Sequence, residues 1–359
     1  MTTVVLVRTP LNVICAREAV SHFGIDPSSV VLGVFDHDRP AARRQLWSSL
    51  EDTGLLDHVR SVSLLTPIVP VKSMRNVRQM AQHLGGPVDD LIIGSYMLGP
   101  FRQLMDLVEP RRTILVDDGA ATERVAARRA TWTAGGRADP HLRWSNETTL
   151  ENTADRLRGP LGRLLARTAI HPGYYADIAS EPDQLTIFTY LELPQSVPDP
   201  IVRLTFDSLR ADIAGAPRND ATLFLGSPLV RTGKVDRAEY LSYLDRAQRT
   251  VGDFVYLPHR HERPEDLRAI EQQTGVTIRH PSRCIELAIG RDLPVPERVV
   301  APWSSALETL AVLLAGVTSI GHLPLPVDSF RPAARTRAAR RYDHLASLRQ
   351  TPIERLALD

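Results

Sequence analysis

Acidic, basic and hydroxyl side chains that could take part in a group transfer follow apolar runs at several places in this chain. The candidates are Asp117 and Asp118 in an Asp-Asp-Gly turn, His259 in Tyr-Leu-Pro-His-Arg-His-Glu, Glu286 in Cys-Ile-Glu-Leu, and Ser304 and Ser305 in Pro-Trp-Ser-Ser-Ala-Leu. A carboxylate can deprotonate an attacking hydroxyl, and a histidine can donate a proton or a hydrogen bond to a departing phosphate. These residue types together indicate a reaction in which a hydroxyl is activated and a phosphate is held.

The acidic turn at 117–119 follows an apolar run at 113–116 that we expect to form a strand. Residues at the carboxyl ends of parallel strands face the ligand crevice of an α/β domain. Gly119 permits a tight turn, which lets a carboxylate project into that crevice. Such a turn alone is more often an Asx turn that caps the next helix. Its combination with the later motifs favours a catalytic carboxylate.

His259 and Glu286 are the candidates for contact with a nucleotide. His259 follows the expected strand at 254–257, where it could reach a phosphate oxygen, although the polar residues after it also fit an ordinary surface loop. Glu286 stands alone in an apolar segment, where a carboxylate needs a partner. The two hydroxyls of a ribose would satisfy it, and a salt bridge to Arg283 is the alternative.

The serine pair precedes an apolar helix that we expect at 305–315. Two hydroxyls and the free N–H groups of a helix N-terminus form a site for one phosphate. The stretch from Ser305 to Glu308 also fits a capping box, in which the serine serves the helix itself. The two interpretations are compatible if Ser305 caps the helix while Ser304 binds the phosphate.

Three further residues are candidates for binding because they also end apolar runs. Gly226 and Ser227 follow the run at 223–225, and Asn12 lies shortly after the run at 4–7. A glycine at a strand end lets the backbone approach a ligand closely. Each of the three is more often simple turn chemistry, so they support the other motifs and do not stand alone.

The composition excludes several classes of protein. With 359 residues, a hydrophobic share of 43% and a charged share of 24%, the chain is long enough for two ordinary globular domains. A net charge of +1 argues against a nucleic-acid binder. Cys15 and Cys284 offer neither a disulfide framework nor a zinc spacing. No apolar run has the length of a membrane-spanning helix, and we expect a cytoplasmic protein.

The arginine-rich stretch at 331–340 raises the possibility of a peripheral membrane contact. Arginines on a helix can touch anionic lipid, and the commoner explanation is a solvated helix face.

Short β-branched runs alternate with helical stretches, a pattern that predicts α/β architecture with parallel sheets. In the first half we expect strands at 4–7, 30–35, 91–93 and 113–116, with helices at 16–23, 75–83 and 101–108. In the second half we expect strands at 223–225, 254–257, 276–278 and 299–300, with helices at 237–250, 264–274 and 305–315.

The segments between these two series suggest how the chain is divided. Residues 131–175 are polar and irregular, and the proline-rich stretch at 192–200 is a plausible hinge. We therefore expect two Rossmann-like domains facing across a cleft, at 1–195 and 196–335. The tail at 336–359 could pack back onto the first domain.

Several common nucleotide and hydrolase motifs are missing from the sequence. It contains no Walker A motif, no Gly-x-Gly-x-x-Gly, no Gly-x-Ser-x-Gly and no His-Glu-x-x-His. Because we assign no Asp-x-Asp triplet to a metal that would hold a nucleotide diphosphate, we expect a donor with a single phosphate, which needs less charge neutralisation. We accordingly expect no metal and no other cofactor to be required.

Taken together, these motifs resemble the bacterial sialyltransferases and polysialyltransferases that use CMP-sialic acid, above all the lipooligosaccharide sialyltransferase-like group. Val-Arg-Thr-Pro-Leu-Asn resembles the family's first-strand pattern, with Asn12 where glutamine is common. The resemblance also rests on the segments at 114–122, 185–189, 223–229, 256–262 and 302–307. It covers most of the chain.

The resemblance implies a GT-B fold and an inverting, metal-independent glycosyltransferase. Its donor would be a CMP-activated sialic acid or related nonulosonic acid, and its acceptor a hydroxyl of a glycan or glycoconjugate. It implies Asp118 as general base with Asp117 second, His259 at the CMP phosphate and as a candidate acid, Glu286 on the ribose, and Ser304 and Ser305 on the phosphate. Because His259 is followed by arginine where the family's motif has proline, phosphate binding is the firmer of its two roles.

Two other functions remain open at this stage. One is a different GT-B nucleotide-sugar enzyme, with another donor or with epimerase activity, and the other is a non-catalytic sugar-binding relative. The acceptor and the linkage are also open, and we expect acceptor contacts from the first domain and from 131–175. The formation of a homodimer is left open as well.

Overall fold

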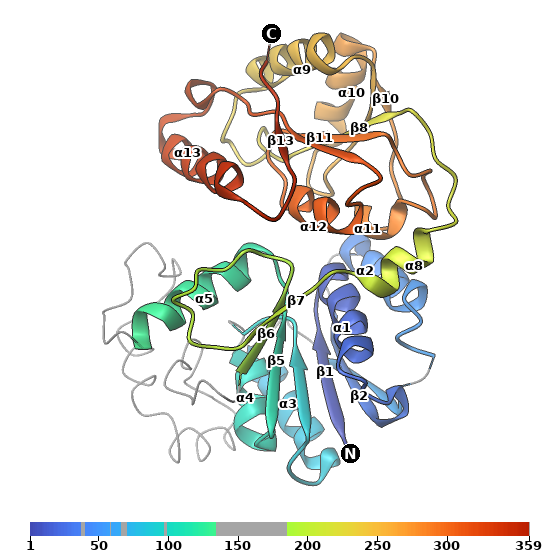
Figure 1. Ribbon diagram of the computed structural model, residues 1–359, viewed down its shortest axis with the longest axis vertical. Helices are drawn as coiled ribbons and strands as arrows, with labels where there is room; N and C mark the ends of the chain where they lie inside the picture. Colours follow the sequence, from blue (N-terminus) through green and yellow to red (C-terminus); the bar gives the residue numbers. More distant parts are fainter. Residues whose placement is uncertain (37–39, 58, 66–69, 97–98, 134–184, 359) are drawn as a thin grey trace. The chain divides into compact units, whose positions relative to one another are not determined.

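The computed structural model describes the whole chain except residues 37–39, 58, 66–69, 97–98, 134–184 and 359, and it divides into two compact units. The first unit is Met1–Ser208 and the second is Leu209–Asp359. Each contains one parallel sheet with helices beside it (Figure 1). The predicted α/β class with parallel sheets is therefore confirmed.

The sheet of the first unit has seven parallel strands in the order β3-β2-β1-β4-β5-β6-β7. The strands are β1 (Thr3–Val7), β2 (Val30–Phe35), β3 (Ser61–Leu65), β4 (Asp90–Ile93), β5 (Arg112–Val116), β6 (Leu185–Thr189) and β7 (Ile201–Arg203). The strand order reverses between β1 and β4. In doubly wound folds, ligands bind outside the carboxyl ends of the strands at this switch point.

Helices cover both faces of the first sheet (Figure 1). They are α1 (Pro10–His22), α2 (Pro40–Asp52), α3 (Pro70–Leu84), α4 (Gly99–Val108) and α5 (Ala120–Thr133). Helix α1 packs against α2, and α3 packs against α4. Because both faces are covered, β1 and β2 are buried along their whole length and read as continuous apolar runs.

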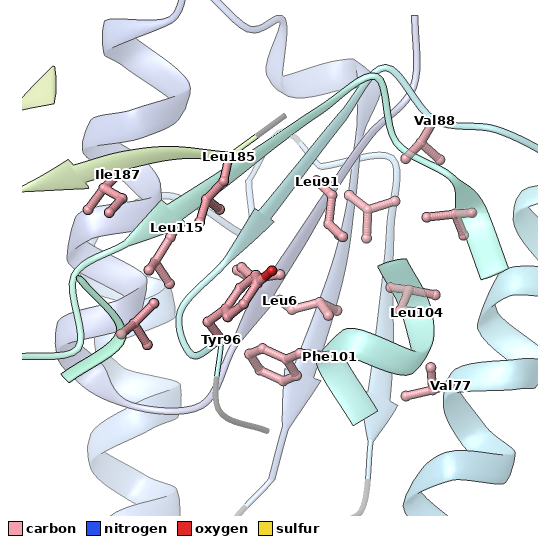
Figure 2. Packing of buried hydrophobic residues seen from close by; sticks show 14 of the residues in the cluster. Leu6, Val77, Val88, Leu91, Tyr96, Phe101, Leu104, Leu115, Leu185 and Ile187 are labelled. Atoms are coloured by element: carbon pink, nitrogen blue, oxygen red, sulfur yellow. The ribbon is translucent and has the colours of Figure 1, made fainter. Parts of the chain in front are cut away.

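The core on the α3 and α4 face of the first sheet is shown in Figure 2. Leu6, Leu91 and Leu115 of three neighbouring strands belong to one buried cluster with Val77 of α3 and Leu104 of α4. This packing holds β1, β4 and β5 in register, so their carboxyl ends occupy fixed positions beside one another.

The second unit repeats the strand order of the first, with six parallel strands in the order β10-β9-β8-β11-β12-β13. The strands are β8 (Thr222–Leu225), β9 (Phe254–Leu257), β10 (Thr277–Ile278), β11 (Arg298–Ala301), β12 (Ser319–His322) and β13 (Glu354–Arg355). Their switch point lies between β8 and β11. Phe224 of β8 stacks on Phe254 and Tyr256 of β9, with ring centroids 4.7 and 5.6 Å apart.

The helices of the second unit follow its strands in alternation. They are α9 (Arg237–Val251), α10 (Pro264–Thr274), α11 (Ile285–Ala288), α12 (Ala306–Leu313) and α13 (Pro332–Ser347), and α8 (Asp207–Ile213) spans the division between the units. The observed α10 has the predicted bounds. None of the helices that the structure describes is both long and apolar enough to cross a bilayer.

The division of the chain differs in two places from the expected boundaries. Strand β7 pairs with β6, so the first sheet continues to Arg203, beyond the expected end of the first domain at residue 195. The tail from 336 onward contributes α13 and β13 to the second unit, where β13 pairs with β12 and Tyr342 packs on Trp303 and Phe330.

Candidate functional site

Residues that follow β1, β4 and β5 meet around the buried amide of Asn12. Its Nδ2 donates to the carbonyl oxygens of Gly94 and Asp117, at 3.1 and 3.2 Å, and to Oδ1 of Asp118 at 3.2 Å. Its Oδ1 accepts the Thr9 N–H at 3.2 Å. A Cβ at Gly94 would meet Asn12, with Oδ1 only 2.6 Å away, so the glycine makes room for this side chain. The amide of Asn12 is engaged by protein groups and holds Asp118 across the switch point.

Asp117 is the structural member of the acidic pair. Its side chain is fully buried, Oδ1 accepts the Gly119 N–H at 2.6 Å and the Thr122 hydroxyl at 3.2 Å, and Oδ2 accepts the Thr189 hydroxyl. The Gly119 contact is the Asx turn that the sequence allows, and Gly119 has a φ of +63° that suits glycine. Burial raises the pKa of Asp117 to about 7. Both of its oxygens are occupied in joining β5, α5 and β6.

Asp118 is half-buried and is the more accessible carboxylate of the pair. Its backbone N–H donates to the Thr122 hydroxyl at 2.9 Å, and Asn12 holds Oδ1. Burial raises the pKa of Asp118 to about 6, and hydrogen bonds from Asn12 and Ser95 and the charge of Arg8 oppose the rise. A carboxylate with this pKa is ionised at pH 7.5 and is a stronger base than an ordinary aspartate.

His259 lies after β9, and its ring is held in one tautomer. Nδ1 accepts the backbone N–H of His261 at 3.2 Å, so the neutral ring carries its proton on Nε2. The backbone N–H of His259 donates to Oε2 of Glu262 at 2.6 Å. Burial, together with the charges of His261 and Arg260, lowers the pKa of His259 to about 4. At neutral pH it is therefore an uncharged hydrogen-bond donor.

Gly226 and Ser227 connect strand ends and are covered by protein. A Cβ at Gly226 would meet the Glu262 carboxylate and the Tyr256 hydroxyl, the latter at 2.6 Å. Ser227 is buried, and its hydroxyl donates to the carbonyl oxygen of Trp303. The Glu262 and Tyr256 side chains fill the space beside Gly226 in which the sequence suggested a ligand. Gly226 and Ser227 therefore support the candidate site through contacts with other protein groups.

Glu286 is buried in α11 and contacts the first turns of α12. Its Oε1 accepts the Thr309 hydroxyl at 3.0 Å. Burial raises the pKa of Glu286, and hydrogen bonds to its own backbone N–H, to Thr309 and to Cys284, with the charge of Arg260, oppose the rise. Arg283, the alternative partner considered from the sequence, forms an ion pair with Asp292.

Ser304, and not Ser305 as the sequence suggested, hydrogen bonds the start of α12. Ser304 Oγ accepts the Ala306 N–H at 3.2 Å, whereas Ser305 makes no side-chain cap bond and is exposed. The predicted capping box is wrong, because the Glu308 carboxylate accepts a hydrogen bond from Arg341 of α13 and does not turn back to the helix start. The hydroxyl of Ser305 is thus the one that faces solvent at the start of α12.

The topology brings the candidates of the second unit together. Strands β9, β8 and β11 are parallel neighbours, so His259, Ser227 and Ser304 follow adjacent strand ends at one edge of the sheet. The Glu286–Thr309 contact adds α11 to this group. The arrangement can hold an anion with neutral donors and a helix N-terminus, and it offers a carboxylate for sugar hydroxyls.

The described residues do not test two expectations, namely that 131–175 contacts the acceptor and that no metal is required. The segment 131–175, expected to contact the acceptor, lies almost wholly in the undescribed range 134–184. An Asp-x-Asp triplet at 36–38, of the general form that can hold a metal, follows β2. Asp36 lies 3.1 Å from Nε of Arg43, and the other two residues of the triplet are not described. That no metal is required stays a prediction.

Solved structures match nearly the whole chain at low sequence identity, whereas no protein-family model and no curated protein matches it. The Arabidopsis thaliana protein UGT89C1 complexed with UDP-L-rhamnose has 9% identity and a TM-score of 0.50, and the match covers 100% of this chain and 86% of that chain. A UDP-GlcNAc 2-epimerase from Neisseria meningitidis bound to UDP-GlcNAc has 8% identity and a TM-score of 0.47, with 96% and 91% covered. The first likeness, together with two parallel sheets of Rossmann order, shows the predicted GT-B fold. It shows the fold alone.

Proposed function

We propose that this protein is a metal-independent glycosyltransferase. It transfers sialic acid or a related nonulosonic acid from a CMP donor to a sugar hydroxyl. The observation that carries the proposal is Asp118, a half-buried carboxylate held by Asn12 at the switch point of the first sheet, with its pKa raised to about 6. A group with these properties suits proton abstraction from a hydroxyl. The CMP donor is inferred from the residues of the second unit and from the sequence resemblance.

In the proposed reaction, the second unit holds CMP through its phosphate and its ribose. The Nε2–H of His259 donates to a phosphate oxygen, and the start of α12 with the Ser305 hydroxyl binds the same phosphate. Glu286 accepts hydrogen bonds from the ribose hydroxyls. Because His259 is neutral at pH 7, it stabilises the leaving phosphate by hydrogen bonding and does not need to transfer its proton.

Asp118 acts on the acceptor in the same step. The acceptor oxygen attacks the anomeric carbon while its proton passes to the Asp118 carboxylate. The bond between the anomeric carbon and the phosphate oxygen breaks, and CMP leaves with the bonding electron pair. A single displacement of this kind inverts the anomeric carbon. The departing phosphate monoester has a second pKa of about 6, so it leaves readily at neutral pH without protonation.

A second candidate is a UDP-sugar enzyme with the same fold. It is favoured by the UDP-L-rhamnose in the Arabidopsis thaliana structure. The two candidates differ in the number of phosphates that the second unit must hold. One exposed serine, one histidine and one helix N-terminus make a small set of donors, which suits a single phosphate better than two.

Calorimetry with CMP, UDP and GDP, followed by a donor screen, tests the proposal. We expect CMP to bind at least about tenfold more tightly than UDP, a difference of about 1.4 kcal/mol. CMP-Neu5Ac, CMP-Kdn or CMP-Kdo should then release free CMP in the presence of EDTA. Tight UDP binding without CMP binding would favour the second candidate, and CMP release that stops on chelation would overturn the metal-free mechanism.

A further inference from the structure

We propose that Glu262 is a positioning residue of the donor site, fixing the loop that carries His259 and coupling it through buried hydroxyls to the loops after β8 and β11. The inference rests on the proposed role of His259 in nucleotide binding. In the sequence Glu262 belongs to a polar run that fits an ordinary surface loop, and it stands three residues after His259. Glu262 is not a catalytic residue in this proposal, because it acts through His259.

Both oxygens of the Glu262 carboxylate are engaged by groups of the site. Oε2 accepts the backbone N–H of His259 and Oε1 accepts the Tyr256 hydroxyl, each at 2.6 Å. Gly226 leaves the space into which this carboxylate and the Tyr256 hydroxyl fit. Two short bonds to one carboxylate therefore tie the His259 loop to the body of β9.

A further hydrogen bond joins the Tyr256 hydroxyl to Tyr240, and its donor can be assigned. Tyr256 gives its only hydroxyl proton to Glu262, so Tyr240 must be the donor in the 3.1 Å contact between the two tyrosine oxygens. The backbone N–H of Ser227 lies close enough to the Tyr240 hydroxyl to oppose the rise in its pKa, and the Ser227 hydroxyl donates to the Trp303 carbonyl. These contacts link the loops after β9, β8 and β11, which carry the proposed phosphate contacts.

The consequence for His259 is a fixed ring. With its backbone N–H held by Glu262 and its Nδ1 held by the His261 N–H, the Nε2–H has one direction in which to point. A displacement of about 1 Å in such a group can cost roughly a hundredfold in function. A cavity of about 10 Å³, lined by Ser227, Tyr240 and Glu262 among others, has room for about one water.

Protonation should loosen this arrangement. Burial raises the pKa of Glu262 to about 7, and a protonated carboxyl can no longer accept two hydrogen bonds at full strength. The groups that face or flank Glu262 are Tyr256 of β9, Tyr240 and Arg237 of α9, Asp266 of α10, Arg231, and His259 and His261 of the loop. Arg237 is paired with Asp266 at 2.5 Å. Nucleotide affinity should therefore weaken as the pH falls through about 7.

Glu262→Gln is the informative variant. Its amide has only one acceptor oxygen, so it cannot accept both the His259 N–H and the Tyr256 hydroxyl as the carboxylate does. We expect CMP affinity to fall about three- to tenfold, the value of roughly one hydrogen bond, and the pH step near 7 to disappear. The ¹⁵N shifts of the His259 ring, measured without ligand, should move from a pure Nε2–H tautomer toward a mixture. Glu265→Gln, on an exposed residue of the same segment, is the matched control and should change none of these quantities.

A double-mutant cycle separates positioning from general stabilisation. If Glu262 acts through His259, Glu262→Gln should change CMP affinity less than about twofold in a His259→Ala background. Additive losses, or an unchanged His259 tautomer in Glu262→Gln, would overturn the inference. If the wild type binds UDP in place of CMP, the proposed donor is wrong, and the same double-mutant cycle is then measured with UDP. If no nucleotide binds, the ligand-free ¹⁵N spectra still decide whether Glu262 holds His259.

Discussion

The two units use the same strand order but hold their polar residues in different ways. In the first unit a single amide, that of Asn12, spans the ends of three strands and leaves one carboxylate, Asp118, half-exposed. In the second unit the Tyr240 and Tyr256 hydroxyls and the Glu262 carboxylate hold the loop of the neutral His259, and the Ser227 hydroxyl joins the loops after β8 and β11. A raised carboxylate pKa suits proton transfer, and fixed neutral donors suit anion binding.

This difference shows that one sheet topology can place either a carboxylate of raised pKa or an uncharged hydrogen-bond donor at its switch point. At Asp118, burial strengthens a base that must accept a proton. At His259, burial suppresses the positive charge and leaves a directed N–H. Substitutions in each unit and the pH dependence of turnover can break or sharpen this separation between a reacting unit and a binding unit.

The largest expected effect follows from Asp118→Asn, which removes the base and keeps the shape of the side chain. Turnover should fall by about 10²- to 10⁴-fold, the usual contribution of a general base. CMP affinity, which belongs to the second unit, should stay within about twofold. Measurement of kcat by CMP release and of Kd by calorimetry would check both, and unchanged turnover would remove Asp118 from the mechanism.

A second prediction concerns the stability that the Asp-Asp-Gly turn provides through Asp117. Asp117→Asn should lower the free energy of unfolding by about 1–3 kcal/mol, because the amide NH₂ cannot accept one of the three hydrogen bonds now made to the carboxylate. Urea unfolding followed by circular dichroism gives the value. A variant that is stable but inactive would reverse the roles of Asp117 and Asp118 and break the comparison.

The pH dependence should differ between kcat and nucleotide binding. The pKa of Asp118 is raised to about 6, so a fall in pH protonates the base and kcat should drop about tenfold per unit below pH 6. His259 stays neutral across this range because its pKa is lowered to about 4. A kcat profile with no step between pH 5 and 7 would contradict the role of Asp118, and Asp118→Asn supplies the control profile.

The smallest expected effects separate the two serines. Ser305→Ala should weaken CMP binding by about three- to tenfold, the value of roughly one hydrogen bond, with little change in stability. Ser304→Ala should lower stability by about 0.5–2 kcal/mol through loss of the bond to the Ala306 N–H. Calorimetry with CMP and thermal unfolding of the two variants would measure these effects. Weaker binding in Ser304→Ala with lower stability in Ser305→Ala would restore the roles inferred from the sequence.

Much of the fold follows from the apolar pattern. The strand at Val30–Phe35, the strand at Phe254–Leu257 and the helix at Pro264–Thr274 have their predicted bounds. Long apolar runs between glycine, proline and polar turns are read correctly because burial on both faces of a parallel sheet demands them.

Three of the strands that were not predicted from the sequence share a weak apolar signal. Strand β3 (Ser61–Leu65) carries serines and an exposed Val62, and β12 (Ser319–His322) contains Gly321, whose missing Cβ leaves room for Leu356. Strand β13 (Glu354–Arg355) is polar and exposed. These strands are held by pairing with a neighbour, and backbone pairing leaves no pattern in the side chains.

The sequence was sufficient for the α/β class and for the strand ends at which polar residues gather, because both depend on local apolar periodicity. It could not assign roles within neighbouring pairs. Asp117 is structural because Thr189, 72 residues away, meets its carboxylate, and Asp118 is the accessible acid because Asn12, 106 residues away, holds it. Similarly, α13 draws Glu308 away from the serines. Side-chain direction in a loop is set by hydrogen-bond partners distant in the chain, and those partners come together only when the sheet and its helices have packed.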